Sequence, residues 1–192
     1  MKLKLTLIVA LLLAQFTLAQ DLASLKESTQ KIYLATTTLD YDAILDSTYP
    51  KVFEILPKAQ MKEILIETFN GNEQMKIKLL NIAPNFEYGE IIKIGDQNFC
   101  LIDHNLEMEL TLTEKIEGEE IEMMVDLLKA AMETERVTFS KEANSFTVKK
   151  KSTMIGISDA ATKNQWKFIN KDKENVLVNK LFSNKVVTAL GL

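Results

Sequence analysis

The chain has 192 residues, of which 46% are hydrophobic and 26% charged, and its formal net charge is −4. This composition is ordinary for a globular protein and allows a core of useful size, so disorder is not the expected state. Arg136 is the only arginine, and no basic stripe is present. Both facts argue against a nucleic-acid-binding protein, which needs a basic surface for phosphates.

Residues 1–19 have the layout of a secretory signal peptide. Two lysines precede the apolar run Leu5–Ala14, and small side chains stand at the cleavage positions up to Ala19. The run is too short to cross a bilayer core of roughly 30 Å, and no other run approaches that length. We expect cleavage near Ala19 and export to the periplasm or medium, with no membrane span in the mature chain, 20–192. Removing two lysines and no acidic residue leaves 21 basic and 27 acidic residues, a net charge of −6.

The mature chain begins with segments of helical period. Asp40 is placed to cap a helix, and Pro50 and Pro57 can each open one. Gly71 supplies a left-handed stop. We expect helices over residues 21–38, 41–47, 50–56 and 58–70.

The period then changes to the alternation of strands. The clearest case is Leu106–Leu112, where Leu110 should face the core and Glu109 the solvent. The same parity carried backward adds Cys100, Ile102 and His104 to the apolar face, provided that no bulge or turn intervenes at residues 103–105. We expect strands over residues 75–79, 87–94, 98–113, 136–140, 145–157 and 165–170, a helix over 119–133 and short helices after 174.

Helices followed by mostly antiparallel strands predict an α+β fold in one domain, 20–192. N-terminal helices should pack on a curved sheet, with an inserted helix and a short C-terminal helical tail. The opening helices, the phrase Asp40–Asp46 leading into Tyr49-Pro50, and the late strand Trp166–Ile169 resemble the cone-shaped nuclear transport factor 2-like (cystatin-like) superfamily. Exported bacterial proteins with this layout are similar over roughly residues 21–170. The order and number of strands stay open.

The resemblance implies a concave side of the sheet that can form a pocket. Candidate ligand residues on it are His104, Tyr49, Phe53, Met108 and Trp166. His104 is open to three interpretations: a core or turn residue, a ligand contact, or an acid-base group. Its neighbour Asp103 would point to the opposite face of a regular strand and could not orient it.

Metal and cofactor motifs are missing from the sequence. The cluster Asp40, Asp42 and Asp46 lacks the glycine turn and further oxygen ligands of a calcium loop, so capping and a solvated face explain it better. With one histidine and one cysteine, a zinc cluster cannot form. Cys100 cannot form an internal disulfide and should be a buried thiol. We expect no metal, no cofactor and no catalytic residue identifiable by motif.

Three functions remain open on the sequence. The first is an exported non-catalytic module that binds a small apolar or amphipathic molecule on the concave side. The second is an acid-base enzyme of the isomerase or dehydratase type, using His104 or a buried carboxylate. The third is an interaction protein that forms a homodimer through the sheet. The fold alone does not choose among them.

Overall fold

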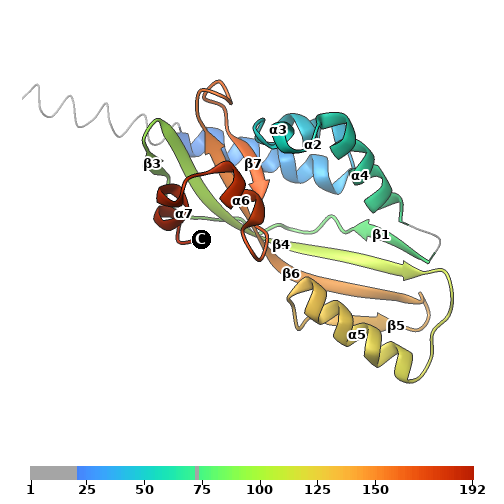
Figure 1. The fold of residues 1–192 in the computed structure, drawn as a ribbon. Helices are drawn as coiled ribbons and strands as arrows, with labels where there is room; N and C mark the ends of the chain where they lie inside the picture. The colour runs from blue at the N-terminus through green and yellow to red at the C-terminus, as the bar shows by residue number, and fades with distance from the viewer. Residues whose placement is uncertain (1–20, 72–73) are drawn as a thin grey trace, which may run out of the picture.

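The computed structural model describes residues 21–71 and 74–192 (Figure 1). These residues form an α+β fold in which helices lie against an open, curved, antiparallel sheet, as the sequence predicts. The expected leader, residues 1–19, lies outside the described residues. In the described part, no helix combines the length and the apolar character needed to cross a membrane.

Capping residues determine where helices of the N-terminal layer begin and end. The Asp40 carboxylate accepts a hydrogen bond from the Ala43 amide at 3.1 Å and so starts α2. Gly71 ends α4 with a φ of 74°, and a Cβ there would clash with the Met75 carbonyl oxygen, so the position requires glycine. The layer consists of a helix over residues 21–37, α2 (Tyr41–Ser47), α3 (Val52–Ile55) and α4 (Lys58–Asn70).

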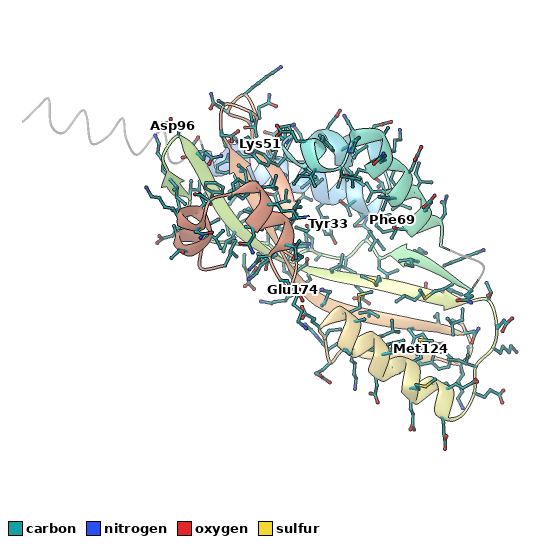
Figure 2. All side chains as sticks on the ribbon, viewed as in Figure 1. Tyr33, Lys51, Phe69, Asp96, Met124 and Glu174 are labelled. Atoms are coloured by element: carbon teal, nitrogen blue, oxygen red, sulfur yellow. The ribbon has the colours of Figure 1, made fainter. Side chains whose placement is uncertain are left out.

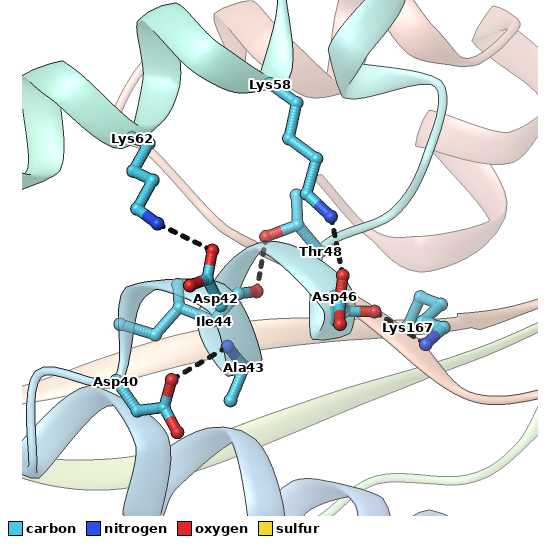
Figure 3. A network of polar contacts seen from close by, with 9 residues as sticks. All are labelled: Asp40, Asp42, Ala43, Ile44, Asp46, Thr48, Lys58, Lys62 and Lys167. Carbon is cyan, nitrogen blue, oxygen red and sulfur yellow. Dashed lines mark hydrogen bonds and ion pairs between the residues drawn. The ribbon is translucent and has the colours of Figure 1, made fainter.

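Ion pairs join α4 to α2 (Figure 3). Lys58 Nζ lies 2.5 Å from Asp46 Oδ1, and Lys62 Nζ lies 2.7 Å from Asp42 Oδ1. Lys167, from a later strand, donates to the carbonyl oxygen of Asp46 at 2.6 Å. The acidic cluster therefore serves capping, as expected, and its exposed carboxylates also form ion pairs with α4. Nowhere in residues 21–71 and 74–192 are three His, Cys, Asp or Glu side chains grouped to hold a metal ion.

The sheet is built around two long antiparallel strands, β4 and β6. Among the described residues it has seven strands in the order β1-β4-β6-β5, with β2 and β3 also paired to β4, and β7 to β6. The strands are β1 (Met75–Leu79), β2 (Glu87–Tyr88), β3 (Ile92–Ile94), β4 (Gln97–Leu112), β5 (Val137–Ser140), β6 (Ser145–Ser158) and β7 (Lys167–Asn170).

The expectation of one strand over 87–94 is wrong, because the segment is divided into β2 and β3. Tyr88 pairs with Ile102 and Ile92 pairs with Phe99, so three residues, 89–91, stand opposite two. The extra residue is a β-bulge, which interrupts pairing and bends an edge strand.

The parity expected for β4 is confirmed by its pairing, although Glu109, expected to face the solvent, is half-buried and accepts a hydrogen bond from Ser145. The register of β4 with β6 runs without a break from Asn98 opposite Ser158 to Thr111 opposite Ser145, so no bulge interrupts residues 103–105. Leu110 is 1% exposed, as the pattern predicts.

Helices cover both faces of the long strands. On one face, Cys100 and Ile102 pack against Leu25 and Ile32 of the helix over 21–37. Further along the same face, Leu110 packs with Leu128 of α5 (Glu119–Met132).

The opposite face is covered by the C-terminal helices. Phe99 of β4, together with Ile155 and Ile157 of β6, packs under α6 (Val176–Leu181) and α7 (Asn184–Leu190). In Figure 1 these two helices lie across the strands from the N-terminal layer. The predicted helical tail is therefore a core-forming element.

Candidate functional site

A groove of about 350 Å³ opens between the helix over 21–37 and the segment that leads into β7. Most of its lining is polar, with hydroxyl groups from the helical layer facing amide groups from the segment before β7. Its lining includes Ser24, Ser28, Ser47, Asn164, Gln165 and Trp166. This arrangement can donate and accept hydrogen bonds around a small molecule.

The charged side chains that line the groove form ion pairs or hydrogen bonds with nearby residues. Lys31 Nζ lies 2.7 Å from Glu27 Oε1, one helical turn away. The hydrogen bond and positive charge of Lys31 lower the pKa of Glu27. Lys167, on the other wall, is held by the Asp46 carbonyl oxygen at 2.6 Å. The groove thus presents a paired acid and base and one tethered ammonium group.

Trp166 is the candidate ligand residue that lines this groove. Its ring is 5% exposed, and its Nε1 donates to the Asp21 carbonyl oxygen at 3.2 Å. A Cβ added at Gly156 would lie 3.4 Å from the ring and 3.1 Å from Leu25, so the glycine permits this close packing. The ring is therefore fixed by packing, and little of Trp166 is exposed to the groove.

His104 lies elsewhere, in an aromatic cluster beneath the helix over 21–37. It is 7% exposed, with ring centroids of Tyr33 at 6.1 Å and Phe86 at 6.0 Å. Among the described residues, its Nδ1 has no hydrogen-bond partner. Burial lowers the pKa of His104, against the opposing influence of the nearby backbone and of Asp103.

The expectation that Asp103 points away from His104 is consistent with its contacts. Its carboxylate accepts a hydrogen bond from Thr153 Oγ1 at 2.6 Å, on the other face of the strands. Consequently, Asp103 is not in place to orient His104 as a general base.

Tyr49 is held in the core on the opposite face from His104. It is fully buried and stacks on Phe182 with centroids 5.6 Å apart. Its hydroxyl donates to Asp159 Oδ2 at 2.7 Å, and Gln97 Nε2 donates to the same oxygen at 2.7 Å. Burial raises the pKa of Tyr49, and the Asp159 carboxylate raises it further.

Asp159 and Gln97 were not among the sequence candidates. The one local signal is the spacing Asp-x-x-Thr: the Asp159 carboxylate accepts from the Thr162 amide at 3.0 Å, and Thr162 Oγ1 accepts from the Asp159 amide at 2.9 Å. That spacing identifies a turn. It carries no information about Tyr49, which is distant in the sequence.

The two remaining candidates have different surroundings. Phe53 is half-buried, with Lys58 Nζ 6.0 Å from its ring centroid. Met108 is 8% exposed and belongs to the cluster under α5. The structure therefore does not bring the five candidates into one pocket.

Cys100 is buried, as expected. Its Sγ donates to the Gly89 carbonyl oxygen at 3.3 Å. Burial raises the pKa of the thiol to about 11, so the reactive thiolate is scarce at neutral pH.

No protein-family model matches the chain, and no curated protein shows a significant match to it. The fold and the groove define the class of protein: an α+β protein whose helices cover a curved antiparallel sheet and border a small polar groove.

Proposed function

We propose that this protein is an exported, non-catalytic binding module that holds a small amphipathic molecule in the groove beside Trp166. The observation that carries the proposal is the groove of about 350 Å³, whose lining combines hydroxyl and amide groups with Trp166 and Phe168. Small-molecule sites in proteins span about 300–1,000 Å³, so this volume suits a compact ligand. Export rests on the leader-like sequence of residues 1–19.

We propose a non-catalytic function because the buried side chains with shifted pKa values lie away from the groove. His104 and Tyr49 are buried in separate cores, and neither lines the groove. The acid and base that do line it, Glu27 and Lys31, are bonded to each other on an exposed helical turn. A general acid or base needs a tuned pKa and access to the substrate, and these groups do not combine the two.

The proposal includes the resemblance to the nuclear transport factor 2-like superfamily. Helices packed on a curved antiparallel sheet support that resemblance. The face bearing Cys100 and Ile102, however, is filled by Leu25 and Ile32. We therefore place the ligand at the margin of the helical layer.

A plugged variant tests the groove. Ser28 is half-buried in the lining, so Ser28→Phe should fill the space without disturbing the core. Gln30→Phe, on the exposed side of the same helix, is the matched control. Thermal-shift screening would use sugars, amino acids, short amphiphiles, fatty acids and sterols.

At least one compound should raise the melting temperature of the wild type and of the control but not of Ser28→Phe. Calorimetric titration of that compound then measures its affinity for each protein. Equal binding by Ser28→Phe and wild type would refute the groove as the ligand site. No stabilisation by any compound class would refute the binding function.

A further inference from the structure

The solvent-facing side of α5 carries an apolar stripe that nothing in the described chain covers. Met123 is 68% exposed and Leu127 is 60% exposed, the highest values among the exposed large hydrophobic side chains of the described residues. They lie one turn apart, and exposed Ala130 and Ala131 continue the stripe. The stripe does not pack on the sheet. Met124 and its neighbours, on the other side of α5, make that contact (Figure 2).

Negative charge is concentrated around this stripe. Residues 114–135 hold eight acidic and two basic residues, a net charge of −6, against −4 for the whole chain. All eight acidic side chains are exposed. Of these eight, only Glu133 and Glu135 form ion pairs within the described residues, with Lys173 and Lys129. The helix dipole explains acids in the first turn of α5 but not the exposed Met123 and Leu127.

The charge decides what can cover the stripe. A second copy of the same face would bring two surfaces of charge −6 together, and anionic lipid or nucleic acid would be repelled in the same way. An apolar stripe framed by carboxylates instead complements an amphipathic helix with apolar anchors and flanking lysines or arginines. The flexible side chain of Met123 can adapt to such an anchor. We propose that α5 is a docking surface for a cationic, amphipathic protein segment.

This surface is independent of the proposed ligand groove. The groove is bordered by the helix over 21–37 and the segment before β7, whereas α5 packs on β5 and β6 (Figure 1). Failure of one proposal therefore leaves the other standing.

The test uses a defined probe and matched variants. The probe is a fluorescent peptide of about 18 residues, or five helical turns, made of leucine and lysine in an amphipathic pattern. A peptide with the same composition in scrambled order is the control. Fluorescence anisotropy measures binding of both peptides to the purified chain at low and at physiological salt.

Two variants weaken the surface, and each has a counterpart elsewhere. The combined change E119Q, E120Q and E122Q on α5 is matched by E54Q, E63Q and E67Q, which alters net charge equally on exposed residues of α3 and α4. The change M123S with L127S is matched by L34S with I64S, at side chains that are 55% and 49% exposed.

The patterned peptide should bind more tightly than the scrambled one, and salt should weaken its binding. Each α5 variant should lose about tenfold in affinity, whereas each counterpart should stay within about twofold of wild type. Equal losses in a variant and its counterpart, equal binding of the two peptides, or no binding at all would overturn the proposal. A dimer that M123S with L127S dissociates would also overturn it, because the partner would then be a second copy.

Discussion

Replacing Tyr49 by phenylalanine removes one hydroxyl from the interior and tests the bond to Asp159. Tyr49 is 0% exposed and Asp159 is 5% exposed, with 2.7 Å between hydroxyl and carboxylate oxygens. A hydrogen bond to a charged group contributes about 1.5–3 kcal/mol. Gln97 still donates to the same carboxylate oxygen in the variant. We therefore expect Tyr49→Phe to lower the free energy of unfolding by about 1.5–2 kcal/mol, the lower part of that range.

Asp159→Ala should cost more, because it leaves the buried Tyr49 hydroxyl without its acceptor and leaves Gln97 Nε2 with only its longer bond to the Tyr49 oxygen, at 3.4 Å. Removing one partner of a buried charged network costs about 3–5 kcal/mol. The double variant Tyr49→Phe with Asp159→Ala should lose less than the sum of the two, with a coupling energy of about 1–3 kcal/mol.

The pH dependence gives a second observable. Burial alone would raise the pKa of Asp159, but hydrogen bonds from Tyr49, Gln97 and the Thr162 amide outweigh it and lower the pKa. The unfolded chain then binds the proton first, so the stabilisation is present above the ordinary pKa of 3.8 and is lost as pH falls through the folded value. Asp159→Asn should remove this part of the acid sensitivity.

Urea denaturation followed by Trp166 fluorescence, at neutral pH and at several acidic values, measures all three effects. Additive free energies in the double variant would refute the reasoning. A loss below about 0.5 kcal/mol for Tyr49→Phe, the range of ordinary surface substitutions, would refute it too.

The remaining predictions concern single side chains. Leu110→Ala should lower the free energy of unfolding by about 2–5 kcal/mol, because it leaves a cavity in the core. Glu109→Ala should lower it by only about 1 kcal/mol, because it removes the hydrogen bond that Ser145 donates to Glu109. Equal losses in urea denaturation would mean that the strand is misplaced. Native Cys100 should resist a thiol reagent at pH 8, and reductant should leave the melting temperature unchanged, whereas rapid labelling would contradict its burial. Because the folded pKa of His104 is lowered, stability should fall as pH drops through its ordinary value of 6.5 and level off below the folded pKa. His104→Phe should remove that loss in melts across the range, and an unchanged pH profile would contradict it.

The sequence predicted most elements because their signals are local. Asp40 and Gly71 act on their own neighbours, which is why the bounds expected for α2 and α4 agree with the structure. Alternation in β4 likewise depended only on residues two apart. The bulge at 89–91 could not be found in this way, because it is defined by the partner strand.

The candidate site was harder to predict. The sequence pattern shows which residues lie on an apolar face, but not whether that face borders a cavity. Tyr49 and His104 do lie against apolar surfaces, but on opposite sides of the sheet. Trp166 was a candidate as part of a strand expected over 165–170, but β7 begins at Lys167, and Trp166 borders the groove from the segment just before it. The serines that face it have no pattern of their own, since an exposed serine on a helix is common whether or not a ligand is near.

Two buried polar side chains bear on the proposal that binding takes place at the surface. The Asp159 carboxylate is 5% exposed and is surrounded by its own donors, Tyr49, Gln97 and the Thr162 amide. The Nδ1 of His104 is unpaired within the described chain, but Tyr33 and Phe86 enclose the ring. Both groups therefore lack access to a substrate, which proton transfer requires. The accessible polar groups lie in the groove and around α5, where their carboxylates, hydroxyls and amides are suited to recognition.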